Sequence, residues 1–158
     1  MNRRYYCLLI VLFFAVLIQA AAAERTYNIL FIQSYTSQTP WHSDLNQGLV
    51  KGFKESGLKV NITTEYLDAD FWAFNSEKVI MRRFCQRARD RQTDLIITAS
   101  DEAFYTLFAC GDSLPLQIPV VFFGIKYPDM ELIATHPNVC GFTANPDLSL
   151  IHISEPTR

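Results

Sequence analysis

The sequence predicts an α/β domain built on a doubly wound, five-stranded parallel sheet. Two observations carry this prediction: strand-like segments alternate with helical segments, and the strand-like segments are apolar at successive positions. Continuous apolar runs are typical of parallel strands that helices cover on both faces. Five such strands favour one sheet with right-handed crossovers. The chain has 158 residues, 49% hydrophobic and 19% charged, which is the composition of one globular domain.

The first half of the chain predicts two strands and two helices. YNILFIQ, residues 27–33, is an apolar strand, and leucine and phenylalanine then recur at helical spacing until Gly57 ends the helix. LKVNITTEYLD, residues 58–68, alternates in polarity and is a second strand. We expect Asn75 or Ser76 to cap the helix that follows.

The second half predicts three further strands. DLIITAS, residues 94–100, is the first of them, and Ser100 is expected to cap a short helix whose acidic first turn begins at Asp101. IPVVFFG (118–124) and NVCGFT (138–143) complete the set. Ligands of such sheets bind beyond the carboxyl ends of the strands, so the segments that follow the strands are the candidate site.

The N-terminal segment, residues 1–23, has the pattern of an export signal, and we expect cleavage after Ala23. Its strongly apolar run, Cys7 to Ile18, is shorter than the roughly 20 residues of a membrane-spanning helix. A retained membrane anchor is the alternative, since the following alanines could extend the run. Both interpretations place the rest of the chain in the periplasm or on the extracytoplasmic side of the inner membrane.

Composition and motifs exclude several functions. From Glu24 to Asp147 there are 11 Lys and Arg residues against 15 Asp and Glu residues, a net charge of −4, which disfavours nucleic acid. The sequence lacks a dinucleotide fingerprint, a phosphate-binding GKS or GKT loop, and a GxSxG nucleophile motif. We therefore expect no catalytic residues, no enzymatic activity and no cofactor in this chain.

The cysteines show no metal-binding pattern, because they form no CxxC pair and have no suitably spaced histidines. Cys85 lies on the apolar face of a predicted helix and is expected to be a core residue. A disulfide between Cys110 and Cys140 is one possible pairing in an exported protein. The sequence alone leaves the connectivity open.

Five segments read together resemble the first lobe of the ABC-transporter substrate-binding-like family, which is related to type 1 periplasmic binding proteins. They are NILFIQSYTSQTPWHSDLNQGL, TEYLDADFW, DLIITASDEAF, IPVVFFGI and NVCGFT, and the resemblance covers residues 27–147. The family also forms the extracytoplasmic sensor region of bacterial histidine kinases, including hybrid ones. The resemblance implies that residues 24–147 are a single lobe of a two-lobed fold, with the second lobe and a membrane-embedded kinase or transporter as partners.

By position, the resemblance implies ligand contacts from residues that follow the strands: Ser34, Tyr35, Trp41, Ser100, Asp101, Gly124 and Ile125. The chain departs from the family pattern at Cys140, where a small polar residue is frequent. Aromatic rings provide flat apolar contact, and a helix start can donate amides to a carboxylate or another acceptor. Lid packing is the alternative role for Tyr35 and Trp41.

The resemblance implies a small-molecule-binding sensor region of a histidine kinase in a two-component system. The alternative is the substrate-binding protein of an ABC transporter. A remote alternative is a flavodoxin-like FMN protein, because SYTSQT after the first strand is similar to the flavodoxin phosphate loop, although Ser37 stands where a glycine is usual. The final residues 148–158, LSLIHISEPTR, resemble a translated sequencing adapter, so we expect the genomic reading frame to diverge after about Asp147.

Overall fold

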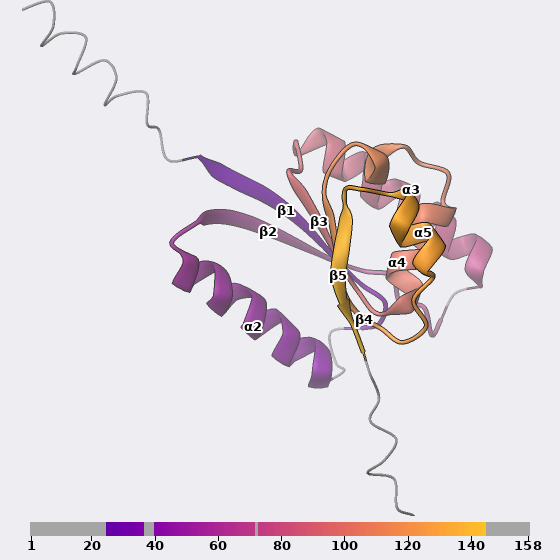
Figure 1. The fold of residues 1–158 in the computed structure, drawn as a ribbon, viewed down its shortest axis with the longest axis horizontal. Coiled ribbons are helices and arrows are strands. Elements are labelled where there is room, and N and C mark those ends of the chain that lie inside the picture. The colour runs from indigo at the N-terminus through magenta and orange to yellow at the C-terminus, as the bar shows by residue number, and fades with distance from the viewer. Residues whose placement is uncertain (1–24, 37–39, 72, 145–158) are drawn as a thin grey trace, which may run out of the picture.

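One parallel sheet with strand order β2–β1–β3–β4–β5 organises the domain (Figure 1). The computed structural model describes residues 25–36, 40–71 and 73–144. The elements are β1 (Thr26–Gln33), α2 (Pro40–Ser56), β2 (Lys59–Tyr66), α3 (Phe74–Asp90), β3 (Leu95–Ala99), α4 (Asp101–Ala109), the 3-10 helix η1 (Leu114–Leu116), β4 (Val120–Ile125), α5 (Met130–Thr135) and β5 (Val139–Thr143). The predicted α/β fold with five parallel strands is confirmed.

The strand order divides the helices unequally between the two faces of the sheet. The step from β1 to β2 runs in one direction along the sheet, and the steps from β2 through β5 run in the other. Because parallel crossovers are right-handed, α2 lies alone on one face, and α3, α4 and α5 lie on the other (Figure 1). We call these the α2 face and the α3–α5 face.

The α3–α5 face holds the larger core. Phe104 of α4 is fully buried at its centre, with ring centroids 5.1 Å from Phe122 of β4 and 5.1 Å from Phe108. Met81 of α3 and Ile96 of β3 are also fully buried in this cluster. Each fully buried side chain of this size stabilises the fold by about 1.5–3 kcal/mol through removal from water.

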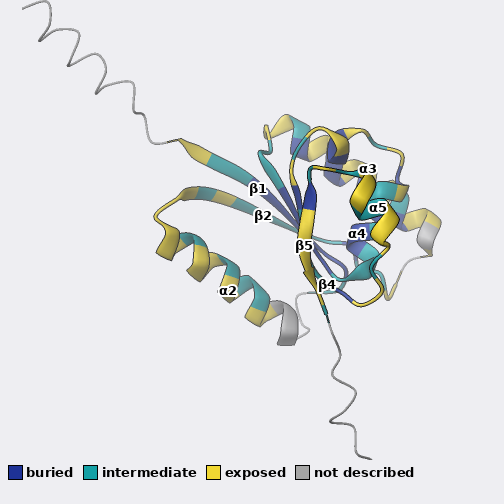
Figure 2. Cartoon of the chain, in the orientation of Figure 1, coloured by how far each residue is buried: buried dark blue, intermediate teal, exposed yellow. Residues whose placement is uncertain are grey.

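The α2 face is covered over only part of its width. Phe31 and Ile97 of the central strands pack against α2, whereas β5 is largely exposed (Figure 2). Phe142 of β5 is 66% exposed, although it stacks on Phe123 of β4 at 5.4 Å. A mostly apolar groove of about 430 Å³ lies between α2 and Phe123. The uncovered half of this face is therefore apolar.

Two predicted helix caps differ from the structure. The helix α3 begins at Phe74 with Ala73 at the capping position, so the expected cap at Asn75 or Ser76 is wrong. Ser100 does occupy the capping position of α4, but its side chain makes no capping hydrogen bond. Ser34 of the neighbouring strand end provides that bond instead, as described below. Among the residues that the structure describes, no helix combines the length and the apolar character needed to span a membrane.

Candidate functional site

The carboxyl ends of β1, β3 and β4 meet at one edge of the sheet. The Ser34 amide donates to the Ala99 carbonyl at 3.2 Å, and the Ser100 amide donates to the Phe123 carbonyl at 2.9 Å. These bonds continue the sheet pairing beyond the strand ends, so that the segments after three different strands lie side by side. The fold therefore brings together Ser34, Tyr35, Ser100, Asp101, Gly124 and Ile125, six of the seven predicted site residues.

Trp41 is the seventh predicted residue. Its backbone lies in the first turn of α2, but its side chain is outside the described part of the structure. The preceding residues 37–39 are also outside it. Both proposed roles for Trp41, ligand contact and lid packing, stay predictions.

Ser34 is fully buried and its hydroxyl connects two strands to a helix. The Oγ donates to the Ala99 carbonyl at 2.9 Å and accepts from the Ala103 amide at 2.9 Å. It thus supplies the hydrogen bond that a helix-capping side chain would make. In this arrangement the Ser34 hydroxyl positions the start of α4 and has no exposed surface for a ligand.

Tyr35 and Glu102 form a polar pair at the same edge. The Tyr35 hydroxyl donates to Glu102 Oε1 at 2.8 Å. Burial raises the pKa of Tyr35 well above its ordinary value, and Glu102, Asp70 and Asp101 raise it further, so the phenol stays protonated at neutral pH. The other carboxylate oxygen, Glu102 Oε2, is buried and has no hydrogen-bond partner among the described residues. A hydrogen-bond donor that reached this oxygen when a ligand entered the edge would satisfy it.

Asp101 joins the start of α4 to the segment after β4. Its carboxylate accepts hydrogen bonds from the Lys126 amide at 3.1 Å and the Tyr127 amide at 3.2 Å. Gly124 makes this arrangement possible, because its φ of 71° lies in the left-handed region and a register shift separates Phe123 from Ile125. Asp101 is therefore held in a fixed orientation by backbone amides.

Ile125 is fully buried in the core of the α3–α5 face. Its side chain consequently packs in the core next to this edge of the sheet and offers no exposed surface to a ligand. The family resemblance placed Ile125 in the site by its position after Gly124 in the segment IPVVFFGI. The burial of its side chain depends on packing with other elements.

Ser100 has the most unusual backbone of the predicted residues. Its φ of 73° and ψ of 171° lie in a region that is almost exclusive to glycine. A non-glycine residue there costs about 1–3 kcal/mol, and such strain is concentrated at functional sites. Ser100 accordingly stays a strong candidate for ligand contact.

The charge of this edge is negative. The carboxylates of Asp70, Asp101 and Glu102 all lie close enough to raise the pKa of Tyr35. Two amides of the first turn of α4 are already used, since Ala103 donates to Ser34 Oγ and Phe104 donates to the Ser100 carbonyl at 3.4 Å. The edge therefore suits a ligand that donates hydrogen bonds or carries positive charge better than it suits the carboxylate considered from the sequence.

Sequence reasoning missed Glu102 and two other polar side chains. Glu102 reads as one of two ordinary acidic residues at a helix start, and its Tyr35 partner lies 67 positions away. Gln33 and Thr98 are fully buried near the same strand ends, and the described residues offer no hydrogen-bond partner to Gln33 Oε1 or Thr98 Oγ1. A polar residue that ends an otherwise apolar strand is the signal that could have identified Gln33. Among the described residues, no cluster of three or more His, Cys, Asp and Glu side chains is arranged to hold a metal ion.

The fold is similar to that of other solved structures. One is a conserved domain protein from Vibrio cholerae O1 biovar El Tor, with 16% identity and a TM-score of 0.58 over 75% of this chain and 39% of that one. Another is the ligand-free, open structure of a substrate-binding protein with adhesive properties from Clostridium difficile, with 18% identity and a TM-score of 0.57 over 78% of this chain and 42% of that one. No protein-family model and no curated protein matches the chain. The chain thus shares its fold with about two fifths of each structure.

Proposed function

We propose that this chain is one lobe of an extracytoplasmic receptor and that the carboxyl edge of its sheet binds a small molecule. The observation that carries the proposal is the buried Glu102 Oε2, which lies beside the Tyr35 hydroxyl and has no hydrogen-bond partner in the part of the chain that the structure describes. The strained backbone of Ser100 at the same edge adds to it. The similarity in fold to a substrate-binding protein from Clostridium difficile supports a binding role rather than a catalytic one.

The ligand class follows from the charge of the edge. A ligand amine or other donor group would hydrogen-bond to Glu102 Oε2 and gain from the nearby carboxylates of Asp70 and Asp101. A ligand carboxylate would meet repulsion from the same groups. We therefore expect a cationic or donor-rich small molecule.

We further propose that the parent protein is a membrane-bound histidine kinase, with this chain in its N-terminal sensor region. The resemblance of its segments to such sensors supports this assignment. A transport receptor is the second candidate, and the similarity in fold to a substrate-binding protein favours it. Deleting the gene in its host would separate the two, because loss of a sensor abolishes ligand-dependent transcription and loss of a transport receptor abolishes ligand uptake.

Thermal-shift measurements test the binding proposal. The probes are matched sets of amines, amides and carboxylates that share one carbon skeleton. A single lobe makes about half of the contacts of a two-lobed site, so we expect weak binding. The probes are therefore added at concentrations on the order of millimolar. The amines should raise the melting temperature more than the carboxylates do.

Variants then assign the response to the site. Glu102→Gln and Tyr35→Phe should weaken the amine-induced shift, whereas Glu131→Gln on the exposed surface of α5 should leave it unchanged. Equal responses in all three variants would remove the assignment to this edge and leave the fold intact. A larger shift with carboxylates would contradict the proposed ligand class.

The flavodoxin alternative is disfavoured by the hydrogen bonds of Ser34. An FMN phosphate loop needs hydroxyls that face the phosphate, but the Ser34 hydroxyl is committed to Ala99 and Ala103. Incubation with FMN followed by gel filtration tests this point. We expect no flavin absorbance in the protein fraction, and stoichiometric flavin would overturn the receptor proposal.

A further inference from the structure

Cys85 and Cys110 lie against each other in the core of the α3–α5 face. Cys85 is on the inward side of α3 and is 0% exposed, and Cys110 follows the last turn of α4 and is 4% exposed. Both belong to the same buried cluster, and the two thiols lie close enough for each to shift the pKa of the other. Both cysteines are free thiols in the structure.

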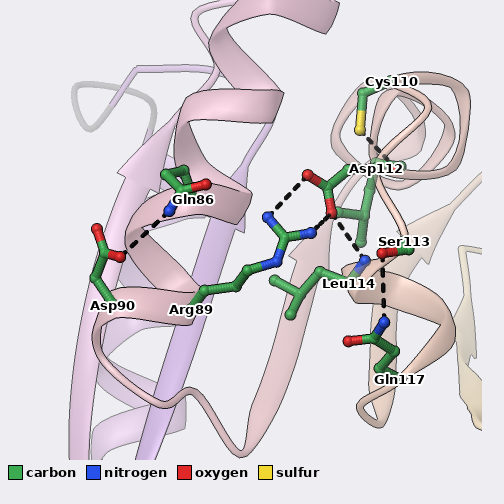
Figure 3. Close-up of polar contacts among 9 residues, drawn as sticks. Gln86, Arg89, Asp90, Cys110, Asp112, Ser113, Leu114 and Gln117 are labelled. Atoms are coloured by element: carbon green, nitrogen blue, oxygen red, sulfur yellow. Dashed lines mark hydrogen bonds and ion pairs between the residues drawn. The ribbon is translucent and has the colours of Figure 1, made fainter.

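A salt bridge holds the same two segments together. Arg89 lies one helical turn after Cys85, and its guanidinium binds both carboxylate oxygens of Asp112, two residues after Cys110 (Figure 3). Asp112 also accepts the Leu114 amide at 2.8 Å, which fixes the turn. Residues four apart on a helix share a face, so Arg89 and Cys85 lie on the same face of α3, and the salt bridge holds that face against the segment that contains Cys110.

The two thiols differ in acidity. The interaction with Cys85 lowers the pKa of Cys110 to about 7, although burial acts in the opposite direction. The interaction with Cys110, together with burial, raises the pKa of Cys85. Cys110 is therefore the more acidic thiol of the pair, and while it is protonated its Sγ donates a hydrogen bond to the Leu107 carbonyl at 3.1 Å.

We propose that Cys85 and Cys110 form a disulfide when the protein meets an oxidising thiol–disulfide pool. An exported protein, as expected from the N-terminal segment, meets such a pool outside the cytoplasm. The pairing differs from the Cys110–Cys140 bridge considered from the sequence. Cys140 is exposed on β5, whereas Cys110 is buried against Cys85.

The chemistry is thiol–disulfide exchange with an external disulfide such as glutathione disulfide. The Cys110 thiolate attacks one sulfur of that disulfide, which releases one glutathione and leaves Cys110 in a mixed disulfide. Cys85 then loses its proton and attacks the Cys110 sulfur, which releases the second glutathione. The two protein thiols thus lose two protons and two electrons, and one external disulfide is reduced to two thiols. Because both sulfurs are buried, exchange requires transient opening of the turn after α4.

The disulfide would connect α3 to the end of α4 and close a loop of about 26 residues. Cross-links of this length restrict the unfolded chain, so we expect the melting temperature to rise on the order of 10 °C on oxidation. The link would attach the end of α4, the helix that carries Asp101 and Glu102, to α3. It would therefore restrain the position of α4 relative to α3.

Peptide mapping tests the pairing without a variant. The full chain is purified under reducing conditions and equilibrated with glutathione and glutathione disulfide. It is then denatured in the presence of iodoacetamide, which alkylates the free thiols, and digested with trypsin. The three cysteines of the domain then lie on separate peptides, 84–87, 92–126 and 127–158. We expect a disulfide between peptides 84–87 and 92–126, with Cys140 alkylated or bound to glutathione. Alkylation of both Cys85 and Cys110, or a link from either to Cys140, would overturn the proposal.

Melting curves with and without dithiothreitol provide a second measurement. The difference between oxidised and reduced protein should vanish in Cys85→Ala and persist in Cys140→Ala, the exposed control. A difference that persists in Cys85→Ala would contradict the pairing. If Cys85→Ala does not fold, the peptide map of the wild-type chain decides the question.

Discussion

Replacing Ser34 by alanine tests the central structural claim about the candidate site. The hydroxyl of Ser34 is the only change, and it makes two hydrogen bonds of 2.9 Å, one to the Ala99 carbonyl and one from the Ala103 amide. The Ala99 carbonyl keeps a second donor, the Ser34 amide at 3.2 Å. The Ala103 amide, in contrast, loses its partner in a residue that is fully buried.

The magnitude follows from that orphaned amide. A buried donor without a partner costs about 1–3 kcal/mol, and loss of a helix cap costs about 0.5–2 kcal/mol. Both figures describe the same lost bond, so they are not added. We expect Ser34→Ala to lower the free energy of unfolding by about 2 kcal/mol and the melting temperature by about 8 °C.

Urea unfolding followed by circular dichroism measures this change, with dithiothreitol present to keep the cysteines reduced. Ser43→Ala is the matched control, because Ser43 is exposed on α2 and, among the described residues, its hydroxyl accepts a surface hydrogen bond from Gln47 at 3.2 Å. Hydrogen exchange should also show faster exchange of the Ala103 amide in Ser34→Ala. Equal urea midpoints for the Ser34 and Ser43 variants would refute the capping role.

Four further substitutions have defined outcomes. Ser100→Gly should raise the free energy of unfolding by about 1 kcal/mol, since glycine adopts a φ of 73° without strain; a loss of stability in urea would contradict the strained backbone. Gly124→Ala should lower it by at least about 1 kcal/mol for the opposite reason, and an unchanged urea midpoint would argue against the left-handed turn. Gly141→Ala would place a Cβ 2.1 Å from the Phe122 carbonyl oxygen, so β5 should lose hydrogen-exchange protection while β1 keeps it. A hydrogen bond from the Asn28 amide of β1, together with the ion pair to Arg25, lowers the pKa of Asp94 below its ordinary value, although partial burial acts in the opposite direction. This carboxylate therefore stabilises the fold above about pH 4 and loses its effect as the pH falls through the lowered pKa. Urea midpoints between pH 5 and pH 2 should fall less steeply in Asp94→Asn, and identical slopes would exclude the contribution.

Local pattern in the sequence determined the class of fold. Runs such as 29–32 and 95–97 are apolar at every position because helices cover both faces of a central parallel strand. That signal depends only on neighbours along the chain, so it is readable without a structure. The same regularity identified the segments after the strands as the candidate site, and the structure does bring Ser34, Ser100 and Asp101 to one edge.

Tertiary structure alone decided which partners these residues have. Ser34 caps a helix 69 positions away, Tyr35 pairs with Glu102, and Cys110 meets Cys85 rather than Cys140. Each contact joins residues that are distant in the sequence and is set by strand order, register and helix packing. Periodicity and capping preferences carry no information about such distances, because they report only the local backbone and the face that is buried. The uneven covering of the sheet, with α2 alone on one face, follows for the same reason from the strand order β2–β1–β3–β4–β5.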